Sequence, residues 1–389
     1  MSSLRGFIIF IVILTVSRTS ARDMSHEPFY APRDIRVFCP PEDVITPCKC
    51  HNTTGILQCF SSLVTDASLS NVFSNLAMHF AQTQEKHVRG LQLYKTEVTH
   101  LNKEILGEIS MECVDMNGNQ NLSLNRLHRV TFATSKSILK TFIYTGVIEA
   151  FWVEQEPNDG AIFEIVDGFM QLTTFWVSET SIPSIQRSAF GRWELPNMKT
   201  VYLAKNEIQD IGDYAFYRLP NLTYLNLQRN SILKITNDTF AFEKASEETL
   251  ILDLTYNLLT MENIEKGAFT RLNRPVTVYL NDNFVTYLDE DVFKPIISDE
   301  RNFVSVKRNP IVCDCRMSWL LGEDIDFMAR VEGLTCKGRR QIWYYTVMEL
   351  DNQCNVTVES SSQSFHFVHS TFTLEILVII VFMLNITSL

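Results

Sequence analysis

A nine-residue template, LxxLxLxxN, recurs through the middle of this 389-residue chain and constrains its fold more than any other feature. It is clearest at residues 222–230. Its last position falls at residues 180, 206, 230, 257, 283 and 309, which are 26, 24, 27, 26 and 26 residues apart. A constant period of this length predicts stacked modules, each of which buries its apolar face only against its neighbours. A Phe follows the template in every clear unit before the last: Phe190, Phe216, Phe240, Phe269 and Phe293.

Each unit is expected to form a short strand around its LxL triplet, with the apolar template residues in a shared core. The residues between them then project from the concave side of the resulting sheet, because side chains alternate along a strand. The Asn amide is expected to point inward and to pair backbone groups that the turning chain leaves unbonded. Thr180 can do part of that task with its hydroxyl. The Phe column is expected on the convex side of the core.

These residues resemble the extracellular leucine-rich-repeat family. The resemblance implies an α/β solenoid, a leucine-rich-repeat horseshoe with a parallel concave β-sheet and disulfide caps at both ends. Repeats are expected over residues 63–305. They are degenerate before residue 172, where weaker copies begin at residues 88, 111 and 139, and an insertion is expected around residues 154–165. We expect eight or nine strands in all.

Nine Cys are many for a cytosolic protein, and eight of them form two clusters that flank the repeats. A secreted chain favours disulfides over zinc thiolates, although spacing alone leaves the connectivity open. Both clusters resemble the family's caps, here expected at residues 39–62 and 306–355. The run at 309–320 matches the C-terminal cap closely. The resemblance implies the pairs Cys39–Cys50, Cys48–Cys59, Cys313–Cys336 and Cys315–Cys354.

Cys113 is the ninth cysteine. The template places it on a strand just before Val114, at a position whose side chain faces outward. Two interpretations stay open: a buried free thiol in a degenerate repeat, and a disulfide to a partner chain.

The N-terminus is typical of a secreted protein. Arg5 precedes an apolar run of 11 residues that ends at Val16, and small residues follow before Arg22. This order predicts a signal peptide at residues 1–21. Six Asn-x-Ser/Thr sequons support an extracellular setting. Apart from Asn385, which lies in the C-terminal tail, they predict glycosylation at Asn52, Asn121, Asn221, Asn237 and Asn355.

A second apolar run, residues 372–384, lies near the C-terminus and has no Lys or Arg after it. We expect a spacer at 356–371 and a hydrophobic tail at 372–389. Small residues, a spacer and a hydrophobic tail form the signal for a glycosylphosphatidylinositol (GPI) anchor, with Ser360 as the candidate attachment residue. A short membrane span is the alternative. Either would place the protein on the extracellular face of the plasma membrane.

The sequence does not favour catalysis. No His occurs between residues 129 and 365, and no GxSxG, HExxH, phosphate-binding glycine loop or dinucleotide fingerprint is present. The acidic run 289–291 lacks EF-hand spacing, so a solvated turn is preferred to a cation site. We therefore expect no catalytic residue, metal or cofactor. The net charge of −11 argues against a nucleic-acid partner.

Recognition is the remaining function, because large aromatic residues favour interfaces. Two columns of the expected concave face hold four rings, which are the candidate partner-binding residues: Trp176, Tyr202, Tyr224 and Tyr279. The alternative is that aromatic residues simply suit strands.

Two functional hypotheses follow. The first is a surface-tethered adhesion or receptor-like protein that binds an extracellular or cell-surface protein. The second is a secreted non-catalytic accessory subunit of an enzyme. It arises because the run 39–50 resembles the N-terminal region of arthropod proteins similar to the non-catalytic subunit of oplophorus-luciferin monooxygenase. The sequence leaves the ligand and the oligomeric state open.

Overall fold

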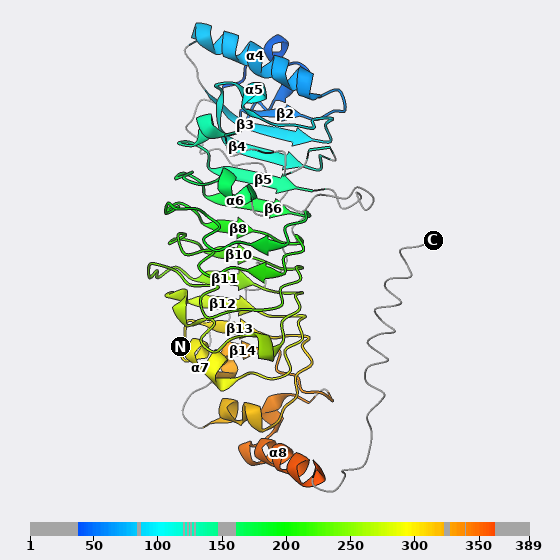
Figure 1. The fold of residues 1–389 in the computed structure, drawn as a ribbon, viewed down its shortest axis with the longest axis vertical. Coiled ribbons are helices and arrows are strands. Elements are labelled where there is room, and N and C mark those ends of the chain that lie inside the picture. Colours follow the sequence, from blue (N-terminus) through cyan, green and yellow to red (C-terminus); the bar gives the residue numbers. More distant parts are fainter. Residues whose placement is uncertain are drawn as a thin grey trace, which may run out of the picture.

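The computed structural model describes residues 38–83, 87–119, 121–122, 124, 127, 130–146, 161–322, 327–338 and 340–361. The predicted signal peptide and hydrophobic tail lie outside the described residues, as do most of the spacer and of the expected insertion. The described chain forms one elongated stack of strands with helical segments at both ends (Figure 1).

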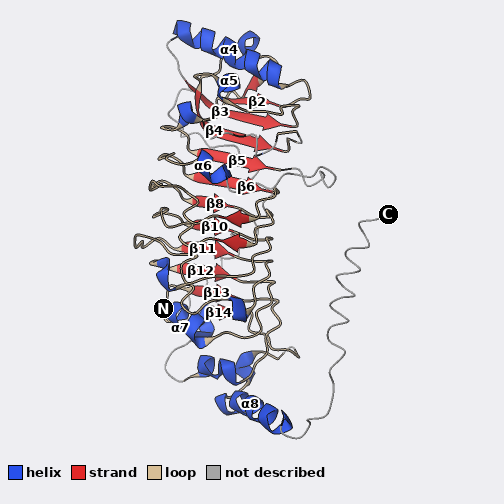
Figure 2. Ribbon diagram, in the orientation of Figure 1, coloured by secondary structure: helices blue, strands red, loops and turns tan. Residues whose placement is uncertain are grey.

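A 12-stranded sheet runs through the described residues from one end of the stack to the other (Figures 1 and 2). Each of the predicted units contributes one strand, and these strands pair in parallel in sequence order. The predicted parallel-sheet solenoid is therefore confirmed. The repeat strands are β3 (His87–Tyr94), β4 (Ser110–Asn117), β5 (Thr141–Thr145), β6 (Thr174–Ser178), β8 (Thr200–Tyr202), β10 (Tyr224–Asn226), β11 (Leu250–Asp253), β12 (Val276–Tyr279) and β13 (Phe303–Ser305).

The Cys-rich ends add strands that the template does not predict: β1 (Lys49–Cys50), β2 (Ile56–Cys59) and β14 (Val331–Glu332). β2 and β14 pair in parallel with the first and last repeat strands, and β1 pairs antiparallel with β2. The nine repeat strands agree with the expected eight or nine, and the ends bring the sheet to 12 strands. The ends continue the sheet, which pairs backbone groups that an open sheet edge would leave unbonded.

The degenerate early units keep the register of the clear ones. Leu91, Val114, Phe142 and Phe175 are successive partners across β3 to β6, and each is at most 1% exposed. The apolar side chain varies in shape between units, but strand alternation fixes the direction in which it points. A weak match to the template can thus still specify a core position.

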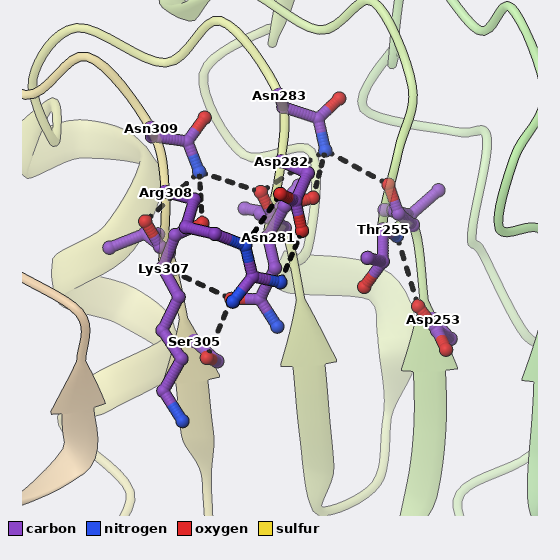
Figure 3. Close-up of polar contacts among 12 residues, drawn as sticks. Asp253, Thr255, Asn281, Asp282, Asn283, Ser305, Lys307, Arg308 and Asn309 are labelled. Carbon is purple, nitrogen blue, oxygen red and sulfur yellow. Dashed lines mark hydrogen bonds and ion pairs between the residues drawn. The ribbon is translucent and has the colours of Figure 1, made fainter. Parts of the chain in front are cut away.

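The template Asn side chains point into the core, as predicted. Asn257 is 3% exposed, and its Oδ1 accepts a hydrogen bond from the backbone N–H of Ile232 at 3.0 Å. Its Nδ2 donates to the carbonyls of Leu227 and Leu254, each at 3.0 Å. Asn283 and Asn309 repeat this arrangement (Figure 3). Every such amide therefore joins its own unit to the preceding one.

The Phe column forms a continuous run of rings on the other side of the core from the sheet. The five predicted rings are at most 4% exposed. Successive ring centroids are 5.9 to 6.4 Å apart. Such spacing suits offset or tilted aromatic pairs and makes each unit depend on its neighbours for burial.

Apart from α4 (Asp66–Thr83) and α8 (Val347–Ser361) near the two ends, the described helical segments are short (Figure 2). The others with α geometry are α3 (Glu42–Ile45), α5 (Lys103–Leu106), α6 (Ala161–Ile165) and α7 (Glu290–Ile297). The 3₁₀ segments are η2 (Ala133–Ser135), η3 (Met261–Asn263), η4 (Thr270–Leu272), η5 (Cys315–Leu321), η6 (Phe327–Arg330) and η7 (Ile342–Tyr344). A separate two-stranded sheet consists of β7 (Ser184–Ile185) and β9 (Asp210–Ile211).

Disulfides tie down both ends of the stack. They join the pairs that the family resemblance implies: Cys39–Cys50, Cys48–Cys59, Cys313–Cys336 and Cys315–Cys354. At the first end, α4 also covers the core with one buried face, whose members are Leu69, Val72, Phe73, Leu76 and Phe80. Both ends of the apolar core are thereby closed, which an open solenoid requires.

Candidate binding face

The side of the sheet that faces away from the core is the candidate site, and we call it the concave face. Strand pairing aligns one residue from every parallel strand into a central column. Neighbouring strands lie about 4.8 Å apart, so the four candidate rings on β6 to β12 span about 19 Å along the stack. In order, the column is Gln58, Gln92, Asp115, Ile143, Trp176, Tyr202, Asn226, Asp253, Tyr279, Ser305 and Glu332.

Trp176 and Tyr202 form a stacked pair on neighbouring strands. Their ring centroids lie 3.6 Å apart and the ring planes differ by 9°. Trp176 is half-buried and donates from Nε1 to the Ser178 hydroxyl at 3.0 Å, which fixes the orientation of the indole. Tyr202 is only 4% exposed. It therefore supports Trp176 and offers a partner little surface of its own.

The next strands bring two tyrosines toward one carboxylate. Tyr279 is the register partner of Asp253, and Tyr224 lies on the neighbouring strand β10. The Tyr224 hydroxyl accepts a hydrogen bond from Asn226 Nδ2 at 2.7 Å. Asp253 Oδ1 accepts from the backbone N–H of Thr255 at 3.0 Å. Tyr224 and Tyr279 are half-buried, so both keep accessible surface on the concave face.

Burial sets the protonation of this cluster. It raises the pKa of Tyr224 to about 12, and it raises the pKa of Tyr202 and Tyr279 as well. All three hydroxyls therefore keep their protons at neutral pH. Burial also raises the pKa of Asp253, because its effect is larger than that of the two hydrogen bonds from Thr255, which lower the pKa. The site thus offers aromatic surface and tyrosine hydroxyls around a carboxyl group, which can bind aliphatic, aromatic and hydrogen-bond-donating side chains.

The N-terminal half of the same column holds a polar ladder that the sequence did not reveal. Gln58 Nε2 donates to Gln92 Oε1 at 3.2 Å, and Gln92 Nε2 donates to Asp115 Oδ2 at 2.9 Å. Asp115 is 6% exposed, and its Oδ1 has no hydrogen-bond partner among the described residues. Burial raises the pKa of Asp115 to about 6, although the Gln92 bond lowers it. The degenerate repeats here gave no signal for this ladder beyond alternation along the strand.

Cys113 lies on β4, beside Gly90 and Thr141 in the register. Its side chain lies in a column of the concave face, as the template predicts, but it is only 9% exposed and forms no disulfide. Burial and the nearby Glu112 carboxylate raise the pKa of its thiol to about 11. A covered, protonated thiol is a poor nucleophile, so the geometry favours the buried-thiol interpretation.

Polar groups hold the C-terminal part of the face together (Figure 3). Asn281 Oδ1 accepts from the Ser305 hydroxyl and from the backbone N–H of Lys307, each at 2.7 Å. At the edge of the face, Arg308 forms a two-point ion pair with Asp282. Ser305 is fully buried by these contacts. Within the central column, Trp176 and Tyr279 keep accessible surface, whereas Tyr202 and Ser305 are buried.

The described residues give two clusters that resemble reactive sites, and neither has the required chemistry. His100 Nδ1 lies 3.4 Å from Asp66 Oδ2, but the same carboxylate accepts hydrogen bonds from Thr99 and so ties the start of α4 to a neighbouring loop. Asp314 lies beside Cys315 and Cys354 in a group that could hold a metal ion. Those two sulfurs are bonded to each other, so they offer no thiolate ligand.

The predicted glycosylation sites lie outside the strands of the concave face. Asn52, Asn121 and Asn237 are exposed, while Asn221 is half-buried and donates to the carbonyl of Pro196 at 2.8 Å. The side chain of Asn355 lies outside the described residues. The three exposed sites lie in connecting segments, so a glycan there would not be attached to a strand of the concave face.

The candidate anchor residue, Ser360, belongs to the last turn of α8, although its side chain is outside the described residues. The helix therefore extends into the segment that the sequence analysis assigned to the spacer. Among the described helices, none combines the length and apolar character needed to cross a lipid bilayer.

Comparison with known proteins supports the repeat assignment where the template is strongest. The family model described as "Leucine rich repeat" matches residues 171–232 and 196–259. The array is a leucine-rich-repeat solenoid. The matched segment carries β6, β8, β10 and β11 and thus most of the aromatic part of the concave face.

Two curated relatives match parts of this leucine-rich-repeat array. Leucine-rich repeat-containing protein 3 of Danio rerio is 33% identical over 106 residues, covering 26% of this chain and 38% of the relative. Toll-like receptor 3 of Bos taurus is 22% identical over 145 residues, covering 37% of this chain and 14% of the receptor. The chain thus spans well under half of either relative.

Solved structures with similar arrays include the leucine-rich repeats of FLRT2, described in an octameric complex with latrophilin 3 and Unc5D. That match has 16% identity and a TM-score of 0.46, and covers 78% of this chain and 97% of the other. A TLR13–ssRNA13 complex matches with 19% identity and a TM-score of 0.43, covering 64% and 31%.

Proposed function

We propose that this protein is a non-catalytic recognition protein, tethered to the extracellular face of the plasma membrane, that binds a protein partner through its concave face in adhesion or receptor-like recognition. The observation that carries the proposal is the cluster formed by the Trp176–Tyr202 stack, Tyr224, Tyr279 and Asp253. These rings are already packed against protein on one side, so binding freezes few additional torsions.

The charges of the central column indicate the chemistry of the partner. The column holds Asp115, Asp253 and Glu332 and contains no Lys or Arg. Lys307, beside the column, is already paired with Glu332, so the column itself offers a phosphate backbone no free cation and a nucleic acid does not fit it. A protein surface with an exposed Lys or Arg beside apolar side chains fits it better, because the basic group can pair with Asp253, the carboxylate that lies among the rings.

The extracellular setting is supported by the disulfides and by the sequence features at both ends of the chain. Four disulfides suit an oxidising compartment. The predicted signal peptide would deliver the chain to that compartment. Surface tethering is proposed through Ser360 and a GPI anchor, with a short membrane span of residues 372–389 as the alternative.

A partner capture followed by a matched pair of substitutions tests the proposed face. The partner is first isolated by pull-down from the native cell surface and identified by mass spectrometry. Its affinity is then measured for the wild type, Trp176→Ala and Trp193→Ala. Trp193 is a suitable control, because it is 58% exposed but lies in the loop before β8, outside the concave face.

Trp176→Ala should weaken binding at least 30-fold, as expected for an aromatic hot spot, while Trp193→Ala leaves it within about threefold. If Trp176→Ala binds as well as the wild type and is folded by circular dichroism, the binding site lies elsewhere. A co-purifying hydrolase or oxygenase as the partner would favour the accessory-subunit hypothesis, which the run at residues 39–50 suggests.

Phospholipase treatment tests the tether separately. Release of the protein from intact cells by a phosphatidylinositol-specific phospholipase is the expected result for a GPI anchor. A membrane-bound fraction that resists the enzyme would reject the anchor and leave the short span.

A further inference from the structure

The C-terminal end of the stack exposes a compact group of apolar and aromatic side chains. Trp343 and Tyr344 are 52% and 64% exposed, and Val347 and Met348 are 41% and 71% exposed. Single exposed apolar residues are common on protein surfaces, but here four large ones fall within six positions, and the ring centroids of Trp343 and Tyr344 lie 6.2 Å apart. Such a concentration of exposed apolar surface usually marks a contact site. We call these four residues the terminal patch.

The terminal patch is rigidly placed. It spans η7 and the first turn of α8. α8 is fixed to the rest of the protein by the Cys315–Cys354 disulfide and by Leu350, which is fully buried. The Arg340 guanidinium lies 4.0 Å from the centroid of the Tyr345 ring and holds the segment between them. Met348 is exposed because the helix turns the face that carries Leu350 toward the core, and Val347, at the start of the helix, is less exposed than Met348.

Position along the chain identifies what can cover the patch. Ser360 lies 12 residues beyond Met348 on the same helix, about 18 Å away at the rise of an α-helix. With a lipid on Ser360 as the tether, the patch would lie within about 20 Å of the attachment point. Figure 1 places α8 at the end of the stack opposite α4, so this end is the one nearest to the tether.

The chemistry of the patch matches the interfacial region of a membrane. Trp and Tyr concentrate at the lipid headgroups because their rings are apolar and their N–H and O–H groups remain hydrated. Among the described residues, the exposed charges beside the patch are Lys337 and Arg340 against Glu349 and Asp351, two of each sign. Attraction to anionic lipid is therefore not required, and a zwitterionic surface is sufficient.

We propose that the terminal patch rests in the headgroup region of the bilayer, so that the solenoid stands end-on with its concave face at a steep angle to the membrane. This inference rests on the proposed tethering. The patch adds a second, non-covalent contact to the membrane, and this contact restricts how far the protein can tilt about its anchor. The concave face is then presented to a partner beside the protein or on an opposing membrane.

Fluorescence quenching in membranes tests the contact. The full mature chain is incorporated in vesicles of phosphatidylcholine whose acyl chains carry bromine, and flotation verifies attachment. Wild type, Trp343→Phe and Trp193→Phe are compared, since Trp193 is about as exposed but lies far along the stack. We expect the bromine-quenchable emission to fall by at least half in Trp343→Phe and to stay at the wild-type level in Trp193→Phe.

Equal quenching of wild type and Trp343→Phe on protein that floats would overturn the contact while leaving the tether intact. A Trp343 emission that shifts to shorter wavelength without bromine quenching would show that another protein covers the patch, and would also overturn it. Failure of the full chain to float would reject both the tether and the contact.

Discussion

Replacing Asp115 by Asn should change how the stability of the protein depends on pH. Asp115 is 6% exposed and receives one hydrogen bond, from Gln92, while its other oxygen has no partner among the described residues. A carboxylate in such a position has lost its hydration with little compensation. Asn has nearly the same shape and no charge at any pH used in the experiment.

The size of this change in stability follows from the pKa of Asp115. Burial raises the pKa of Asp115 from 3.8 to about 6, and about two pKa units correspond to about 3 kcal/mol of folding free energy. The folded state binds this proton more tightly than the unfolded state. The stabilisation from the protonated carboxyl is therefore complete below pH 3.8 and is lost as the pH rises through about 6. Relative to wild type, the free energy of unfolding of Asp115→Asn should therefore increase by about 3 kcal/mol as the pH rises from acidic to slightly alkaline values.

Urea unfolding with the disulfides intact, followed by circular dichroism, measures this difference at about pH 3.5 and about pH 7.5, on either side of the titration. Any cost of the new amide is independent of pH and cancels in the comparison. Asp115→Ala is the control, because it should show a different constant offset and the same pH-dependent gain. A difference between wild type and Asp115→Asn that stays constant within about 1 kcal/mol across this range would refute the argument.

Further predictions concern the stability of the stack, and urea unfolding measures each of them. Asn257→Ala should cost about 3 kcal/mol, because it removes three buried hydrogen bonds; a cost below about 1 kcal/mol would contradict the bridging role. Gly212→Ala should destabilise by at least about 2 kcal/mol, since a Cβ there would overlap the backbone of the preceding unit, whereas Gly322→Ala should be nearly neutral because its nearest contact is at 3.4 Å. Replacing both Cys315 and Cys354 by Ser opens a disulfide that spans 39 residues and should cost about 4 kcal/mol; an unchanged urea midpoint would contradict this expectation.

Periodicity made the repeat core predictable. A position such as Asn257 or Phe240 recurs in every unit with the same neighbours, so one physical explanation serves all copies. The direction of a side chain also follows from strand alternation, which is why the four candidate rings could be assigned to the concave face from the sequence. The strands added at the ends were not predicted, because they lie in Cys-rich segments that do not follow the template.

The exposure of individual residues on the concave face was not predictable. Tyr202 is nearly covered because Trp176, 26 residues earlier in the chain, lies flat against it, and no single-unit pattern contains that contact. Asp115 was missed for a similar reason. Its pKa depends on Gln92 in the neighbouring unit and on desolvation by the surrounding surface, and both are properties of the assembled sheet.

The asparagine bridges have a direction that matters during synthesis. The turn of one unit is completed by the amide of the next: Thr180 donates from its backbone N–H to Asn206, and Asn206 donates in the same way to Asn230. A unit that has just left the ribosome therefore still lacks the acceptor for its own turn until some two dozen more residues emerge. Folding of the nascent chain should therefore lag one unit behind translation, and the series of units ends with the final cysteine-rich segment.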